Sequence, residues 1–125
     1  MTTQVKTLLC IDDHESSVAG WCLYLQNAGY SVETAHSAQE GLELFAVRPI
    51  DLVLLDYAMP DRNGGEVAAT MKRMKPDVCI LMLSGVSDIP ESDRVYIDGF
   101  AEKGHHPIAI LQKIEELLEA RRPAA

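Results

Sequence analysis

The sequence predicts an α/β fold in which a doubly wound, five-stranded parallel sheet carries helices on both faces. Strand-like and helix-like segments alternate from end to end, and no internal repeat or linker interrupts them. Two runs, at 52–55 and 78–83, are apolar throughout, as is typical of parallel strands buried on both faces. Crossovers between such strands are expected to be right-handed.

The first two predicted strands are each followed by a helix. The first strand is predicted over Thr7–Ile11, and the helix after it ends before Gly29. Apolar residues recur in that helix at the spacing i, i+3, i+4 and i+7, namely Val18, Trp21, Cys22 and Leu25. The second strand is predicted over Tyr30–Ala35, and Ser37 with Glu40 forms a capping box that opens the second helix.

The remaining elements follow the same alternation. Strands are predicted over Asp51–Asp56 and Val78–Leu83, with a short fifth strand within Ile97–Glu102. Asn63 caps the third helix, and Pro107 opens the last one. The inward-facing apolar residues of these two helices are Val67, Met71 and Met74, and Ile108, Leu111, Ile114 and Leu118.

Length and composition limit the class of protein. The 125 residues are 47% hydrophobic and 24% charged, which fits one ordinary globular domain. We expect a single domain over 1–125, with its core at about 6–121 and no effector domain. No apolar run approaches the ~20 residues of a membrane span, and the N-terminus has no secretory hydrophobic region. Membrane association is therefore not expected.

The charge balance and the cysteines also restrict the function. Nineteen acidic residues against eleven basic ones give a net charge of −8, which disfavours direct nucleic-acid binding and favours a cationic partner or metal ion. The odd set Cys10, Cys22 and Cys79 contains no C-x-x-C pair. We interpret these cysteines as small buried side chains in a reducing compartment, the cytoplasm.

Polar side chains follow four of the five strands. In open parallel sheets, ligands bind at the carboxyl ends of the strands. The first strand ends in Asp12 and Asp13, the third in Asp56, the fourth in Ser84, and the fifth at Lys103. Each of these residues alone has an ordinary structural explanation, such as a helix cap, a turn or a solvated lysine. Their convergence on one edge of the sheet favours a functional site.

The charges expected at this edge predict its chemistry. Two carboxylates ~4 Å apart repel by about 4 kcal/mol at an effective dielectric constant of 20. One lysine does not neutralise three carboxylates, and their oxygen ligands favour Mg²⁺. A phosphoryl group would supply further oxygens to a partly filled Mg²⁺ site. A carboxylate neutralised by metal and lysine can then act as a nucleophile toward phosphorus.

These residues resemble the receiver domain of two-component response regulators, over about Lys6 to Arg121. The matching segments are C-I-D-D-H, L-V-L-L-D-Y-A-M-P-D-R-N-G, L-S-G and F-A-E-K. The resemblance implies the flavodoxin-like strand order 2-1-3-4-5. It further implies a phosphorylation-dependent switch in two-component signal transduction, which turns over no external substrate.

The resemblance also assigns roles at the site. Asp56 corresponds to the phospho-acceptor, which takes a phosphoryl group from a phosphohistidine on a sensor histidine kinase or phosphotransfer protein. Asp13 and Asp56 correspond to side-chain Mg²⁺ ligands, Asp12 to a ligand through water, and Ala58 to a ligand through its backbone carbonyl. Lys103 is expected to pair with the phosphoryl oxygens.

Two further residues correspond to the switch. Ser84 is expected to move toward the phosphoryl group, and Phe100 to swing inward as Ser84 moves. The output face would then be read by a downstream protein partner that the sequence does not identify. His14, which follows the acidic pair, is expected to be a first-turn helix residue, with contact to an incoming partner as the alternative.

The sequence departs from the family pattern in several places. Lys103 precedes Gly104 where the family usually has proline, so a trans peptide bond is expected. The segment between Ser84 and Lys103 is shorter than usual and poor in helix formers, so the helix within it should be short or irregular. The side chains of Ala58 and Val86, two residues after Asp56 and Ser84, cannot hydrogen-bond a water, which favours slow autodephosphorylation; the alternative is that the space at Ala58 admits water.

Two other functions compete with the switch. Gly104 and the irregular helix motivate a degenerate receiver that acts as a phosphorylation-independent interaction module. An aspartyl phosphohydrolase is disfavoured, because Ala58 stands where such enzymes commonly have a second acid. The chain could be a stand-alone receiver or a piece of a longer regulator or hybrid kinase.

Overall fold

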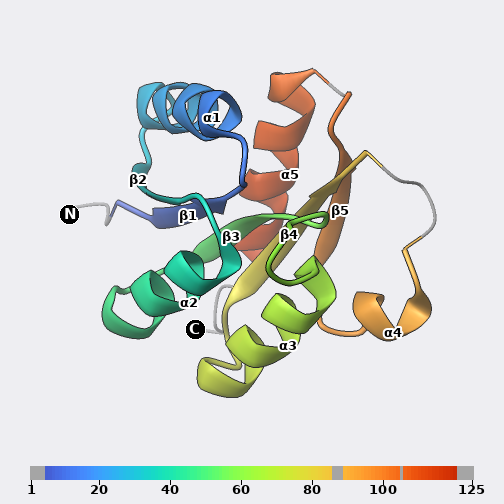
Figure 1. Ribbon diagram of the computed structural model, residues 1–125. Coiled ribbons are helices and arrows are strands. Elements are labelled where there is room, and N and C mark those ends of the chain that lie inside the picture. Colours follow the sequence, from blue (N-terminus) through green and yellow to red (C-terminus); the bar gives the residue numbers. More distant parts are fainter. Residues whose placement is uncertain (1–4, 86–88, 105, 121–125) are drawn as a thin grey trace.

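The computed structural model describes residues 5–85, 89–104 and 106–120. Strands and helices alternate along these residues (Figure 1). The strands are β1 (Thr7–Ile11), β2 (Ser31–Ala35), β3 (Leu52–Asp56), β4 (Cys79–Ser84) and β5 (Gly99–Glu102). The helices are α1 (Glu15–Asn27), α2 (Ala38–Val47), α3 (Gly64–Met74), α4 (Glu91–Arg94) and α5 (Pro107–Ala120).

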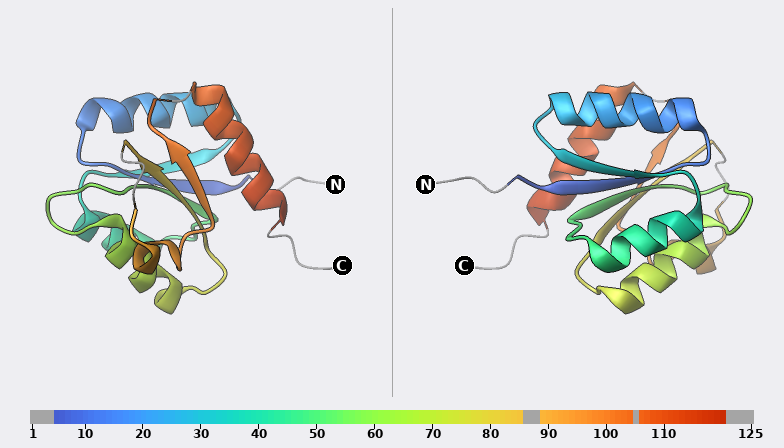
Figure 2. Two further views of the ribbon diagram at one scale, coloured as in Figure 1. Left: turned by 90° about the vertical axis from the view of Figure 1, so that its right-hand side faces the viewer. Right: turned by 60° about the vertical axis from the view of Figure 1, so that its left-hand side comes forward.

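The five strands form one parallel sheet with the order β2-β1-β3-β4-β5, which confirms the predicted topology. Helices α1 and α5 cover one face of the sheet, and α2 and α3 cover the other (Figure 2). Strands β3 and β4 are buried along their whole length. The apolar runs predicted to be buried on both faces therefore lie in strands that both helical layers cover.

The sheet separates two hydrophobic clusters. Successive side chains of a strand point to opposite faces, so Leu55 joins the cluster under α2 and α3, whereas Leu54 joins the cluster under α1 and α5. Phe45 fills the first cluster and is fully buried. Ile114 on α5 fills the second. With a packed layer on each side, the strand ends have little freedom to shift.

The predicted helix caps are confirmed, with one difference in detail. The Ser37 hydroxyl accepts the Glu40 backbone N–H at 3.1 Å. The Glu40 carboxylate reaches back to the backbone N–H of His36, at 2.6 Å, rather than to that of Ser37. Asn63 caps α3 by accepting the Glu66 backbone N–H at 2.9 Å. Both helices therefore begin where the sequence predicts.

Three predicted core positions are wrong. Ile108 is 52% exposed, because α5 turns Ile110 and Ile114 toward the sheet instead. Met74 is 41% exposed, because it is the last residue of α3. Cys22 is half-buried rather than buried. In α5 the apolar pattern allowed more than one inward face, and packing on the sheet selected between them.

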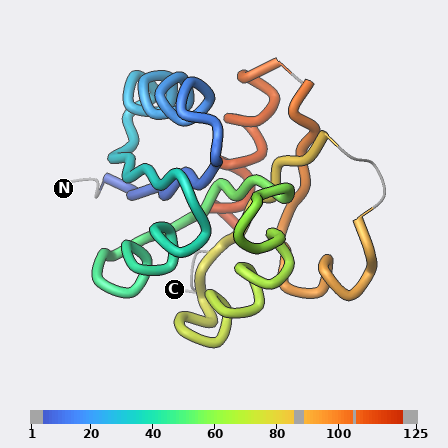
Figure 3. The backbone as a smooth tube through the Cα atoms, viewed as in Figure 1, coloured from blue at the N-terminus to red at the C-terminus, as the bar shows by residue number. Residues whose placement is uncertain are grey.

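The segment between β4 and β5 has the irregular helix that the sequence predicts. Helix α4 is a single turn that lies beside α3 (Figure 3). The peptide bond between Lys103 and Gly104 is trans, as expected. Within the described part of the chain, no helix has the length and apolar character needed to cross a membrane.

Candidate functional site

Four charged side chains meet where strands β1, β3 and β5 end. Asp12 follows β1 and Asp56 ends β3, and because these strands are parallel neighbours both residues emerge at one edge of the sheet. Lys103 follows β5, and its backbone N–H donates to the carbonyl of Ser84 at 3.1 Å. We call Asp12, Asp13, Asp56 and Lys103 the acidic rim.

Lys103 lies close to two carboxylates of the rim. Its Nζ lies 2.9 Å from Asp56 Oδ1 and 3.8 Å from Asp12 Oδ2. Burial raises the pKa of Asp56 above its ordinary value, and the hydrogen bond from Lys103 only partly offsets this effect. Burial alone would lower the pKa of Lys103, but the hydrogen bond and charge of Asp56 outweigh it, so the pKa of Lys103 is raised. Lys103 and Asp56 thus stabilise each other as an ion pair, in a buried site where either charge alone would be unfavourable.

Two carboxylate oxygens of the rim lack a hydrogen bond. Asp56 Oδ2 and Asp13 Oδ1 are both buried and have no hydrogen-bond donor. The Asp56 side chain is only 1% exposed, so water does not solvate it freely. Leaving a buried polar atom unpaired costs about 1–3 kcal/mol, and more for a charged group. A bound cation would satisfy both oxygens.

The donor set fits a divalent cation. One ligand atom from each of Asp12, Asp13, His14 and Asp56 lies within 4.8 Å of the others. Three carboxylates carry three negative charges against the one ammonium of Lys103 at the rim, and hard oxygen donors are those that Mg²⁺ prefers. The unpaired oxygens of Asp13 and Asp56 thus match the ligands that the sequence assigns to Mg²⁺.

Ala58 and Ser84 lie next to the rim. The backbone N–H of Ala58 faces the Asp56 carboxylate. Its hydrogen-bonding contribution lowers the pKa of Asp56, but burial has the larger, opposite effect. Ala58 also forms an isolated bridge with Asn63, which fixes the backbone after β3. Ser84 is 6% exposed at the end of β4. The liganding carbonyl of Ala58 and the movement of the Ser84 hydroxyl stay predictions. Val86 lies outside the residues that the structure describes.

Phe100 and α4 are connected by side-chain contacts that the sequence did not reveal. Phe100 on β5 is half-buried against the cluster under α2 and α3, and the Arg94 guanidinium lies over its ring, 5.2 Å from the ring centroid. The Tyr57 hydroxyl donates to Asp93 Oδ2 at 2.6 Å. Tyr57 directly follows Asp56, so a neighbour of the rim contacts α4. We call these two pairs the α4 contacts.

His14 takes part in the rim more closely than the sequence indicated. It is the N-cap of α1, and its ring Nδ1 lies 3.2 Å from Asp12 Oδ1 and 3.4 Å from Asp13 Oδ1. Its backbone N–H also donates to Asp12 Oδ1, at 2.9 Å. The only sequence signal was its position directly after the acidic pair.

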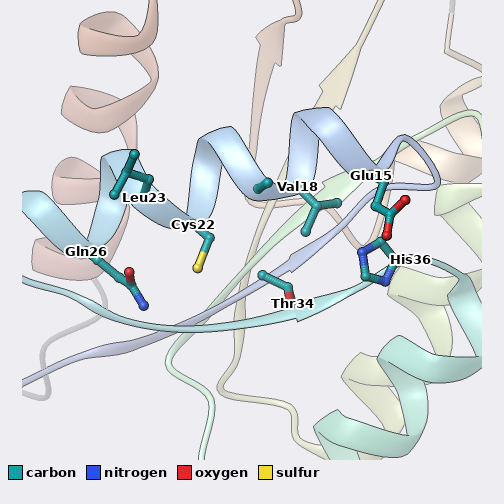
Figure 4. Close-up of a pocket in the computed structure, with 8 residues that line it drawn as sticks. Glu15, Val18, Cys22, Leu23, Gln26, Thr34 and His36 are labelled. Carbon is teal, nitrogen blue, oxygen red and sulfur yellow. The ribbon is translucent and has the colours of Figure 1, made fainter.

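A groove of about 400 Å³ lies between α1 and β2 (Figure 4). Val18, Cys22 and Leu23 line it from α1, and Thr34 lines it from β2. Its lining contains only Glu15 and His36 as titratable groups besides the Cys22 thiol. These residues form no cluster of charged groups comparable with the acidic rim.

The sequence matches known proteins over nearly its whole length. The family described as the response regulator receiver domain matches residues 8–115. The transcriptional regulatory protein GlrR of Escherichia coli is 31% identical over 127 residues, which cover 99% of this chain and 29% of GlrR. The chain therefore spans less than a third of this curated relative.

Two solved structures resemble the fold closely. A response regulator receiver domain protein from Methanospirillum hungatei has a TM-score of 0.87 at 27% identity, covering 94% of this chain and 97% of that one. The response regulator protein TrrA from Thermotoga maritima, solved with Mg²⁺ and BeF, has a TM-score of 0.86 at 29% identity, covering 90% and 99%. TrrA has also been solved in complex with the histidine kinase ThkA.

Proposed function

Because the chain belongs to the response regulator receiver domain family, we propose that Asp56 accepts a phosphoryl group from a phosphohistidine in a Mg²⁺-dependent reaction. One observation carries this proposal. Asp56 is a buried carboxylate with one oxygen bonded to Lys103 at 2.9 Å and the other oxygen without a hydrogen bond. Such a group has a fixed position, and the lysine together with a cation on the second oxygen would neutralise its charge for attack on phosphorus.

The carboxylates of Asp12, Asp13 and Asp56, with the Ala58 carbonyl, would hold Mg²⁺, which supplies positive charge to the carboxylates and to the phosphoryl oxygens. In the transfer, an Asp56 oxygen attacks phosphorus. The new O–P bond forms as the P–N bond breaks, and the ring nitrogen of the donor keeps the electron pair. Lys103 holds the Asp56 carboxylate in place before transfer and is then available to bond the phosphoryl oxygens.

The switch would run from the rim to the face formed by α4, β5 and α5. Ser84 ends β4, and β4 pairs with the strand that carries Phe100. We propose that the Ser84 hydroxyl bonds the phosphoryl group and that Phe100 changes its packing in response. The contact between the Arg94 guanidinium and the Phe100 ring would then change as well, so α4 would form part of the output face.

The partners follow from this reaction. TrrA, solved in complex with a histidine kinase, supports a sensor histidine kinase or phosphotransfer protein as the donor. A protein would read the output face. We propose no turnover of an external substrate. We place the domain in the cytoplasm, where the three free cysteines would stay reduced.

Incubation with acetyl phosphate tests the proposal. Intact mass should increase by one phosphoryl group when Mg²⁺ is present, and Asp56→Asn should abolish the increase. Asp77→Asn, which changes an exposed acid far from the rim, is the matched control and should leave labelling intact. An unlabelled wild type, after incubation with a phosphorylated histidine kinase as well, would instead support a phosphorylation-independent module.

A further inference from the structure

The imidazole of His14 faces the carboxylates of the rim. Its Nδ1 lies 3.2 Å from Asp12 Oδ1 and 3.4 Å from Asp13 Oδ1, although 65% of the side chain is exposed. The ring is therefore free of tight packing, and small rotations cost it little. Its backbone is fixed independently, because the N–H donates to Asp12 Oδ1 at 2.9 Å and the carbonyl accepts the Val18 N–H of α1 at 3.1 Å.

Two buried carboxylate oxygens near the imidazole have no hydrogen-bond donor. Asp56 Oδ2 belongs to a side chain that is 1% exposed and makes no hydrogen bond, and Asp13 Oδ1 is likewise buried without a hydrogen bond, 3.4 Å from His14 Nδ1. One ligand atom of His14 lies within 4.8 Å of one ligand atom from each of Asp12, Asp13 and Asp56. An ion that binds the carboxylates is thus within reach of the imidazole.

Nitrogen changes the preference of an oxygen site. Mg²⁺ takes oxygen ligands and keeps several waters, whereas imidazole suits the divalent transition metals. We propose that His14 Nδ1 is a further ligand of the cation held by Asp12, Asp13 and Asp56, and that it raises the affinity of the site for Mn²⁺ relative to Mg²⁺. This inference rests on the cation site of the proposed function. It adds a residue that discriminates between cations.

A purely structural role for His14 makes a different prediction. In that role the ring would only donate a hydrogen bond to Asp12 and hold it in place. His14→Asn separates the two roles, because the amide can donate a similar hydrogen bond but is a poor metal ligand compared with imidazole. The backbone bond to Asp12 does not depend on the side chain. His36→Asn is the matched control, since His36 is also exposed and its imidazole lies beside Glu40 instead.

The test is a calorimetric titration of the protein with Mg²⁺ and with Mn²⁺. The ratio of the Mn²⁺ affinity to the Mg²⁺ affinity should fall by at least about tenfold in His14→Asn, because the loss of even an outer-shell partner of a metal ligand costs about 10–100-fold in affinity. The Mg²⁺ affinity should remain near that of the wild type. His36→Asn should leave both affinities unchanged.

Pulsed electron paramagnetic resonance of bound Mn²⁺ gives a second, independent readout. The wild type should show a nitrogen coupling that changes with ¹⁵N-histidine and disappears in His14→Asn. Absence of this coupling in the wild type, or an unchanged affinity ratio in the variant, would overturn the proposal while leaving the Mg²⁺ site intact. If the wild type binds neither cation, the cation site of the proposed function fails as well.

Discussion

The acidic rim is set into the edge of a sheet packed on both faces, whereas α4 is a single turn attached by side chains. At the rim, like charges are crowded together, and the rigid strand ends keep them there. At α4, the contacts satisfy both partners: Tyr57 donates to Asp93, and Arg94 lies over Phe100. The packed sheet thus holds the mutually repelling carboxylates in place. Helix α4, which is only one turn long, can move more easily when the charge at the rim changes.

The largest expected effect is on the rate of phosphorylation, which a substitution in the acidic rim should lower and a substitution in α4 should not. Lys103 contributes the ammonium bonded to Asp56, so Lys103→Met should slow Mg²⁺-dependent phosphorylation by about 100-fold, the usual cost of losing a donor to developing charge. Arg94→Ala, at α4, should leave the rate close to that of the wild type. The initial rate of labelling by acetyl phosphate measures both. An Arg94→Ala variant as slow as Lys103→Met would show that α4 controls chemistry and not only output.

The next prediction concerns the repulsion at the rim. Asp13→Asn removes one of three like charges, so without metal the variant should be more stable than the wild type by about 1 kcal/mol, a value discounted for partial exposure. Mg²⁺ at about 100 times its dissociation constant should stabilise the wild type by about 2.7 kcal/mol and the variant by much less.

Urea unfolding in EDTA and in Mg²⁺ measures these differences. Asp77→Asn removes an exposed acid outside the rim and should respond to Mg²⁺ as the wild type does. An Asp13→Asn variant that loses stability in EDTA, yet gains as much from Mg²⁺ as the wild type, would mean that Asp13 neither repels the other carboxylates nor binds the cation.

The two regions also differ in how far the sequence predicts them. The rim follows from the strands, because parallel strands end at one edge and the residues after them meet there whatever the helices do. The shortness of α4 could also be predicted from its poor helix formers. Its contacts could not, because Tyr57 and Asp93 are 36 residues apart and no periodic pattern links them.

The same limit explains the errors in the helices and at His14. An amphipathic pattern with apolar residues on two adjoining faces, as in α5, does not say which face meets the sheet, and Ile108 was assigned to the wrong one. The position of the His14 ring depends on how α1 leaves β1, which is a property of the backbone after Asp13. Both cases need the assembled fold.

A smaller effect is expected where Tyr57 binds Asp93. Tyr57→Phe should destabilise the protein by about 1 kcal/mol near neutral pH, as expected for one partly exposed hydrogen bond. The hydrogen bond to Asp93 raises the pKa of Tyr57 above 10.0, so the folded state favours the protonated phenol. Its stabilisation is complete below pH 10 and is lost as the pH rises through the raised pKa.

The difference in unfolding free energy between wild type and Tyr57→Phe, followed from neutral to alkaline pH, tests this contact. Tyr96→Phe is the matched control, because it removes the hydroxyl of another partly exposed tyrosine. Gly65→Ala sharpens the test, since a Cβ at Gly65 would collide with the Asp93 side chain. In that background Tyr57→Phe should cost little, and an undiminished cost would mean that the hydroxyl stabilises the fold through another group.

The smallest expected effect is at the other α4 contact. The Arg94 guanidinium lies 5.2 Å from the centroid of the Phe100 ring, and an exposed cation–π contact contributes about 0.5–1 kcal/mol. Arg94→Met keeps much of the side-chain length but removes the charge, so it should lower the unfolding free energy by that amount, whereas Arg94→Lys should lower it less. Arg62→Met, at an exposed arginine before α3, controls for loss of a positive charge from an acidic protein. Equal losses for Arg94→Met and Arg62→Met would mean that net charge, and not the Phe100 ring, accounts for the effect.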